Sequence, residues 1–316
     1  MPTDLSHFFT RPLVVCVLAV LCTFLWGSSY PAIKTGYALL DIQAQDTASQ
    51  MVFAGQRFLL AGILLLVLAR LLGRHKANYT PHKIKQIVLL GLTQTSLQYI
   101  FFYIGLAFAT GVKASILNST VTFFSVILAH FIYTNDRITG RRALGCSIGF
   151  IGVFIVNFNN SLLDFQFSLA GEGSVVLAAF ILAAASIYGK KVSEGIDAML
   201  MTAWQLSIGG LALLIIGFVF GGHSGNFSAQ SVMLLIYLAF LSSTAFALWS
   251  VLLKYNSVGT VTIYNFLIPI FGSLLSAVFL GEDILEWKNM VALILVCSGI
   301  FLVVRANRRT VAMVKG

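Results

Sequence analysis

The sequence predicts an all-α integral membrane protein, and its composition, its long apolar stretches and an internal repeat each support that fold class. Of its 316 residues, 58% are hydrophobic and only 10% are charged, whereas soluble proteins are about 45–50% apolar and about 25% charged. The apolar stretches are long and continuous, unlike the short alternating segments of a membrane β-barrel. Because helices satisfy their own backbone hydrogen bonds in lipid, we expect these stretches to be helical.

Ten apolar stretches of roughly 20 residues are long enough to cross a bilayer as helices. The first of them does not resemble a signal peptide, since its apolar run is long and no small-residue cleavage site follows it. In chain order the stretches are Pro12–Ile33, Met51–Leu72, Gln86–Phe108, Lys113–Tyr133, Arg142–Asn157, Gly171–Lys190, Met199–Phe220, Ser231–Leu253, Gly259–Leu280 and Asn289–Arg305.

The basic residues predict how the chain is oriented. With the N-terminus in the cytoplasm and ten crossings, most of the 20 Lys and Arg residues fall on the cytoplasmic side. Only Lys34, Lys113 and Lys288 fall outside, and Arg57 lies within a stretch. Positive residues favour the cytoplasmic side, so we expect both termini there. Anionic lipid headgroups then account for the net charge of +9, and no nucleic-acid partner is needed.

A long segment of the first half is repeated in the second half. Residues Phe101–Val156 align without a gap on Leu248–Val303 after a shift of 147 positions. The aligned pairs include Asn118 with Asn265, Asp136 with Asp283, and Gly152 with Gly299. A repeat of this size is a duplicated half-protein, too long for a solenoid unit.

The repeat predicts two five-helix units, residues 1–160 and 161–316. Five crossings is an odd number, so the second unit must enter the membrane in the opposite orientation. Arg137 and Arg141 on the inside align near Asp283 and Glu286 on the outside, which fits that inversion. Inverted-topology repeats are typical of secondary transporters, which expose a central site alternately to the two sides.

Several motifs resemble the EamA-type family of the drug/metabolite transporter superfamily. They are Leu25–Tyr30, Gln56–Ala61, Pro269, Leu280–Glu282 and Gly299–Ile300. The resemblance implies a ten-helix carrier of the inner or plasma membrane that exports amino acids, metabolites or drugs. The outward direction rests on this resemblance alone.

The first half departs from the family pattern at two places. Thr122 stands where the family's proline is expected, and Thr134–Asn135 stand where Gly-Glu is expected. These motifs describe the scaffold more than the transported solute.

Polar and aromatic groups at membrane depth are costly unless they face the bundle interior or a wet cavity, which makes them candidate substrate-binding residues. Arg57 could hold a carboxylate through its planar fork of donors, or it could pair with backbone carbonyls to fix its helix. The full set of candidates is Trp26, Tyr30, Arg57, Gln94, Gln98, Tyr99, Asn118, Tyr188, Trp249 and Asn265.

Alternative interpretations remain open for the other candidates. Asn118 and Asn265 occupy equivalent places, where they either line a cavity or join helices by hydrogen bonds. Gln94 and Gln98 are spaced i, i+4, so we expect them on one face of a helix that forms a cavity wall with Tyr99. Trp26, Tyr30, Tyr188 and Trp249 could form an aromatic cage, although such rings more often belong to the interfacial belt or the core.

Enzymatic and metal-dependent functions have little support in the sequence. No phosphate-binding loop motif occurs, and the histidines and the four cysteines show no metal-ligand spacing, so we expect no cofactor. His130 is expected to have a packing role, with proton coupling as the alternative. The sequence thus predicts a transporter of a small organic solute, with a passive channel or, less favoured, a membrane-embedded lipid-modifying enzyme as alternatives. The oligomeric state, the solute and the coupling ion stay open.

Overall fold

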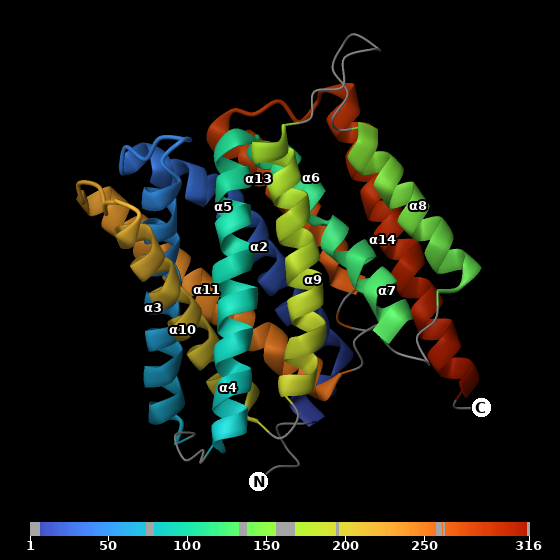
Figure 1. The fold of residues 1–316 in the computed structure, drawn as a ribbon. Helices are drawn as coiled ribbons and strands as arrows, with labels where there is room; N and C mark the ends of the chain where they lie inside the picture. The colour runs from blue at the N-terminus through green and yellow to red at the C-terminus, as the bar shows by residue number, and fades with distance from the viewer. Residues whose placement is uncertain are drawn as a thin grey trace.

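The computed structural model describes residues 7–73, 79–132, 138–155, 168–193, 196–256, 261 and 263–314, and within these ranges the chain is helical and contains no strand (Figure 1). The first half contains α2 (Pro12–Leu39), α3 (Thr47–Leu71), α4 (Pro81–Leu90), the π-helix η1 (Gly91–Leu97), α5 (Gln98–Phe108), α6 (Gly111–Asn118), α7 (Thr120–Ile132) and α8 (Gly140–Ile155). The second half contains the π-helix η2 (Leu169–Gly173), α9 (Ser174–Val192), α10 (Ala198–Val219), α11 (Ala229–Tyr255), the 3-10 helix η3 (Ile263–Phe266), α13 (Leu267–Leu280) and α14 (Trp287–Val314).

The prediction of an all-α membrane protein is confirmed. Seven helical stretches of the described chain are long and apolar enough to cross a membrane. The apolar helices Leu267–Leu280 and Trp287–Leu302 are shorter. The number of crossings, the two inverted repeats and the sides on which the termini lie stay predictions. Thr134, Asn135 and Arg137, used in those predictions, lie outside the described residues.

Glycines bring α3 and α10 into backbone contact near the middle of the bundle. A Cβ atom on Gly210 would lie 2.4 Å from the backbone nitrogen of Leu59, and one on Gly55 would lie 2.8 Å from the carbonyl oxygen of Gly210. Gly62 on α3 and Gly217 on α10 make similar approaches, each about two turns further along its helix. Small residues let membrane helices associate by close van der Waals packing, because lipid supplies no hydrophobic drive between them.

A second close contact joins α8 to α14, which lie side by side in Figure 1. Gly145, Gly149 and Gly152 of α8 lie along its contact with α14. A Cβ atom on Gly299 would lie 2.6 Å from the carbonyl oxygen of Gly145, and one on Gly152 would lie 2.9 Å from that of Ala292. The last described helix of the first half therefore packs directly against the last helix of the second half.

Replacing Gly210 by Val should destabilise the protein by about 1–3 kcal/mol, the usual cost of overpacking a tight contact. The added side chain would force α10 away from the α3 backbone. Thermal unfolding of the detergent-solubilised protein measures this loss. Gly140→Val at the start of α8 is the control, since no atom lies within 4 Å of a Cβ built there. An equal effect of the two substitutions would contradict this account of the packing.

Candidate functional site

Arg57 is buried inside the helix bundle, where it joins three helices. It lies on α3 and is 1% exposed. Its Nε atom donates to Oγ of Ser242 on α11 at 2.8 Å, and Nη1 donates to Oη of Tyr103 on α5 at 3.2 Å. The guanidinium also lies 4.9 Å from the ring centre of Phe58. The partners of this cation are hydroxyl groups and a ring, which are all neutral.

No carboxylate of the described chain lies within ion-pair distance of Arg57. The sequence explains why, because the stretches 47–135 and 198–281 contain no Asp or Glu, and α3, α5 and α11 lie within them. Asp46 caps the start of α3, eleven residues from Arg57 and therefore about 16 Å away along the helix axis. A buried cation without a counter-charge is costly, so Arg57 is the most demanding polar group in the interior.

Seven aromatic rings surround Arg57 and connect it to α2. Each ring has a neighbour whose centroid is 4.2–6.2 Å away. The hydroxyl of Tyr37 donates to the backbone oxygen of Tyr103 at 3.0 Å, which fixes α2 against α5. We call this set the central aromatic layer: Tyr30, Tyr37, Phe53, Phe58, Tyr99, Phe102 and Tyr103.

Asn118 and Asn265 both lie at interruptions of their helices. Asn118 is the last residue of α6, and Asn265 lies in η3, directly before α13. Nδ2 of Asn118 donates to Oη of Tyr30 at 3.0 Å, while its buried Oδ1 has no hydrogen-bond partner in the described chain. Asn265 is half-buried and, within the same residues, has no hydrogen bond. The helices that follow, α7 and α13, begin at Thr120 and Leu267, which are also 147 positions apart.

Gln94 and Gln98 make different contacts. Nε2 of Gln94 donates to Oγ of Ser186 on α9 at 3.5 Å. Gln98 is 2% exposed, and its Oε1 has no partner among the described residues. Gln94 lies in the π-helix η1, and Gln98 follows it as the first residue of α5. Their common face and the cavity wall stay predictions.

The four rings predicted as a possible cage lie in separate places. Trp26 and Trp249 are in contact, with ring centroids 5.0 Å apart. Tyr30 belongs to the central aromatic layer, through Phe102. Tyr188 packs in a different cluster, with Ile87, Leu90 and Met201 among others. The structure therefore supports a Trp26–Trp249 pair and keeps only Tyr30 near the buried polar groups.

An apolar groove lies between α3, α10 and α11, and its lining on α3 is Leu64, Leu65, Leu68 and Leu72. Its volume is about 640 Å³, within the range of small-molecule pockets. Lys254 and Tyr255 line one end, near the start of α2. Phe240 and Ser243, which lie on either side of Ser242 along α11, line the other end. Neither Arg57 nor Ser242 lines this groove, which on α3 stops about two turns short of Arg57.

A second polar cluster occupies the end of the bundle at which α2 ends and α3 begins, which we call the distal end. Glu282, directly after α13, accepts the backbone N–H groups of Gly111 and Val112 at 2.8 Å each. A carboxylate at this place satisfies two unpaired donors of α6 and complements the positive end of its helix dipole. Nζ of Lys34 lies 3.7 Å from Glu282 and donates to the backbone oxygen of Ala109 at 2.7 Å.

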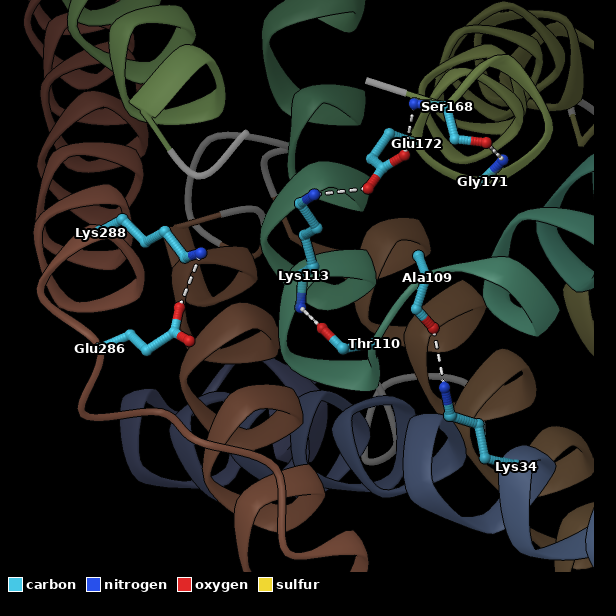
Figure 2. Close-up of polar contacts among 9 residues, drawn as sticks. All are labelled: Lys34, Ala109, Thr110, Lys113, Ser168, Gly171, Glu172, Glu286 and Lys288. Carbon is cyan, nitrogen blue, oxygen red and sulfur yellow. Dashed lines mark hydrogen bonds and ion pairs between the residues drawn. The ribbon is translucent and has the colours of Figure 1, made fainter. Parts of the chain in front are cut away.

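The same helix start is held on its other side by an ion pair with the second half of the chain (Figure 2). Nζ of Lys113 on α6 donates to Oε1 of Glu172 at 2.5 Å. Oε2 of Glu172 accepts the backbone N–H of Ser168 at 2.9 Å. We call Lys34, Lys113, Glu172 and Glu282 the distal latch. Two lysines from the first half of the chain bind two carboxylates from the second half.

The sequence did not reveal the role of Glu282, although the Leu280–Glu282 motif was recognised. The residue that could have indicated this role from the sequence is Gly281. Its φ of 65° is a conformation that favours glycine. This glycine ends α13 and turns the chain so that the next side chain reaches α6. The aligned position in the first half, Asn135, lies outside the described residues.

Two further predictions concern histidine and metal. Nδ1 of His130 accepts the backbone N–H of Ile138 at 3.1 Å, which agrees with the predicted packing role. A search of the described residues finds no group of three or more His, Cys, Asp or Glu side chains placed to hold a metal ion.

The long apolar helices define a multi-pass membrane protein, and comparison with known proteins identifies its family. The profile of the EamA-like transporter family matches residues 13–158 and 169–305. The chain belongs to this family and is a membrane transporter.

Individual relatives are distant but nearly full-length. The chain is 26% identical to the uncharacterized transporter YoaV of Bacillus subtilis, over 89% of this chain and 93% of that protein. It is 25% identical to a probable amino-acid metabolite efflux pump of Salmonella typhimurium, over 95% and 98%. A solved crystal structure matches with a TM-score of 0.68 at 15% identity, over 93% of this chain and 98% of that one, and this likeness concerns the fold alone.

The Lys113–Glu172 ion pair should show an energetic coupling of about 0.5–3 kcal/mol in a double-mutant cycle. Both side chains are largely buried, 20% and 8% exposed, so solvent screens the pair only in part. Unfolding free energies of Lys113→Gln, Glu172→Gln and the double variant in mixed micelles measure the coupling. Strictly additive effects would show that the pair contributes nothing to holding α6.

Proposed function

We propose that this chain is a secondary transporter that moves a small organic solute out of the cell by alternating access. In this proposal residues 1–160 and 161–316 form two inverted five-helix repeats, giving ten crossings with both termini in the cytoplasm. The distal end then faces the outside, and the groove beside Lys254 and Tyr255 faces the cytoplasm.

The distal latch is the observation that carries this proposal. It joins the two halves of the chain at the distal end through ion pairs and hydrogen bonds. Water can replace these polar contacts when the end opens, which offsets part of the cost of breaking them. Below the latch, Ser115 on α6 and Ser273 on α13 are joined by a 3.0 Å hydrogen bond, and a Cβ on Gly272 would lie 2.6 Å from that of Ser115. Small residues here permit two helices to close tightly and to separate again.

Two observations support the inverted repeats. The family profile matches the chain twice, once in each half. In addition, the interruptions before Thr120 and Leu267 occur at positions related by the repeat shift. Interrupted helices at equivalent places in two repeats are typical of transporter binding sites near the membrane midplane.

The outward direction and the class of solute are supported by a relative's name, that of the probable amino-acid metabolite efflux pump. A passive channel is the alternative. An enzymatic role has less support, because the exposed His82 lies in the first turn of α4, at the end opposite Asp41 and Asp46, so these groups cannot form one acid–base pair. Transport by a carrier saturates with solute concentration, and unlabelled solute on one side drives uptake of labelled solute from the other. A channel shows neither behaviour.

Proteoliposomes loaded with unlabelled solutes from an amino-acid and metabolite panel should take up the labelled solute by saturable counterflow. A carrier shows this exchange because its one site must reorient between the two sides. Flux that rises linearly with concentration and shows no counterflow would leave a channel. Turnover of a labelled lipid in the same vesicles would instead indicate the enzyme.

Weakening the distal latch should favour the state that is open at the distal end. With the four native cysteines replaced, a cysteine at Ser115 should react severalfold faster with a membrane-impermeant reagent when Glu282 is replaced by Gln, since the carboxylate no longer holds α6. Glu286→Gln is the matched control, because Glu286 binds only the nearby Lys288, at 2.8 Å, and does not join the two halves (Figure 2). Equal labelling rates in both variants would argue against the latch as a gate.

A further inference from the structure

We propose that a groove between α3, α4 and α10 binds an anionic phospholipid, with the lipid phosphate on Arg70 and Tyr79 and an acyl chain along the apolar wall. The groove lies at the end of the bundle opposite the distal end. The proposal concerns the lipid around the bundle, so it depends neither on the identity of the solute nor on the direction of its transport.

The first step of the argument is the shape of the groove. Its volume is about 610 Å³, and it lies where α3 and α4 flank α10, on the left of Figure 1. On α10 it extends from Leu200 to Ile208, which is about 12 Å along the helix axis. Such a volume is within the range of ligand pockets. The rest of its apolar wall is formed by Leu66, Val67, Ile84, Ile87 and Trp204.

The second step is the order of polar and apolar residues along the groove. Arg70 is in the last turn of α3, and Tyr79 lies two residues before α4 begins. Leu66 lies about one turn deeper than Arg70 on α3, and Ile208 lies about two turns deeper than Leu200 on α10. The polar groups are therefore at the end of the bundle and the apolar ones toward its middle. A phospholipid in the adjoining leaflet has its headgroup and its acyl chains in the same order.

The third step is the charge of Arg70. The side chain is exposed, and no carboxylate of the described chain lies within ion-pair distance of it. Among the described residues that line the groove, Arg70 is the only charged one. Basic pockets between membrane helices bind anionic lipid headgroups. The planar fork of a guanidinium also matches two oxygens of one phosphate.

The fourth step is a donor without an acceptor. The hydroxyl oxygen of Tyr79 is buried and has no hydrogen-bond partner in the described chain. Burial and, to a lesser degree, the carboxylate of Asp197 raise the pKa of Tyr79, so the phenol keeps its proton and can donate it to a phosphate oxygen. Asp197 is itself engaged, because its Oδ1 accepts the backbone N–H groups of Met199 and Leu200 at 2.9 and 3.1 Å.

The fifth step is the chemistry of the apolar wall, which suits an acyl chain better than a peptide. Val67, Ile84 and Trp204 are exposed along the outer surface of the bundle. Apart from Arg70 and Tyr79, the described lining carries no polar side-chain atom except the indole N–H of Trp204. A bound peptide would leave its backbone polar groups without partners on this wall, whereas an acyl chain has none to satisfy. Tryptophan is also enriched where membrane proteins meet the lipid headgroups.

Quenching of Trp204 fluorescence by brominated lipid tests the proposal. The protein in micelles of a neutral alkyl maltoside is titrated with phosphatidylglycerol, phosphatidylcholine or diacylglycerol that carry the same brominated chains. The part of the quenching that Trp204→Phe removes reports the groove. Half-quenching by phosphatidylglycerol should need about fivefold less lipid than by phosphatidylcholine, the preference expected of one arginine. Phosphatidylcholine should in turn be about tenfold more effective than diacylglycerol, which has no phosphate to accept hydrogen bonds.

Two substitutions separate the charge from the hydrogen bond. Arg70→Gln should make phosphatidylglycerol and phosphatidylcholine equal. Tyr79→Phe keeps the ring that packs near Ile87 and should bring phosphatidylcholine close to diacylglycerol, while phosphatidylglycerol stays ahead of both. Arg141→Gln is the matched control, because Arg141 is an exposed arginine at the start of α8 that does not line the groove, and it should change none of the three values. Thermal unfolding identifies any variant that fails to fold, and Tyr79→Phe tests the site without altering its charge.

Several outcomes would overturn the proposal. Equal quenching by phosphatidylglycerol and phosphatidylcholine in the unaltered protein would reject the anionic headgroup, and equal quenching by phosphatidylcholine and diacylglycerol would reject the phosphate contact. The same loss of preference in Arg70→Gln and Arg141→Gln would show an effect of overall surface charge and no site. Absence of quenching by all three lipids, in a protein that sediments as a dimer, would assign the groove to a second copy of the chain.

Discussion

The cost of placing charge in a low-dielectric interior governs the arrangement of this protein. Carboxylates are absent from two long stretches of the sequence, 47–135 and 198–281, and those of the distal latch lie at helix ends, where backbone N–H groups and lysines stabilise them. Arg57 is the exception, a buried cation that hydroxyl groups and rings support without neutralising. The uneven placement of charge along the chain therefore creates both a closed polar end and an electropositive interior.

Backbone geometry brings these groups together. Glycines on α3 and α10 allow the two helices to touch along their backbones, which holds the inner helices close enough for Arg57 to reach α11 and α5. The interruption between α6 and α7 has the opposite effect, because it frees Asn118 from a regular helix and turns it toward Tyr30. Tight packing thus fixes α3 against α10. The interruption after α6 leaves Oδ1 of Asn118 without a hydrogen-bond partner among the described residues.

Much of this arrangement could be predicted from composition and periodicity. The all-α membrane class follows from long apolar stretches, and the depth of Arg57 follows from its place within one of them. The partners of Gln94 and Gln98 could not be predicted, because they depend on which helices pack against this part of the chain. The separation of Tyr188 from Tyr30 and the reach of Glu282 to α6 also depend on tertiary contacts between residues distant in sequence. The sequence thus revealed which polar and charged residues lie within apolar stretches, but it did not reveal which residues they contact.

The short helix α6 connects the two polar regions. Its first residues, Gly111 and Val112, donate to Glu282 of the distal latch, and its last residue, Asn118, lies beside Tyr30 in the interior. Eight residues of α-helix span about 12 Å and behave as a rigid unit. A movement of Asn118 relative to the central aromatic layer would therefore also move the start of α6 relative to Glu282. In the proposed transport cycle, this rigid connection would couple the interior of the bundle to the distal latch, since a ligand shifts a conformational equilibrium by its differential affinity for the two states.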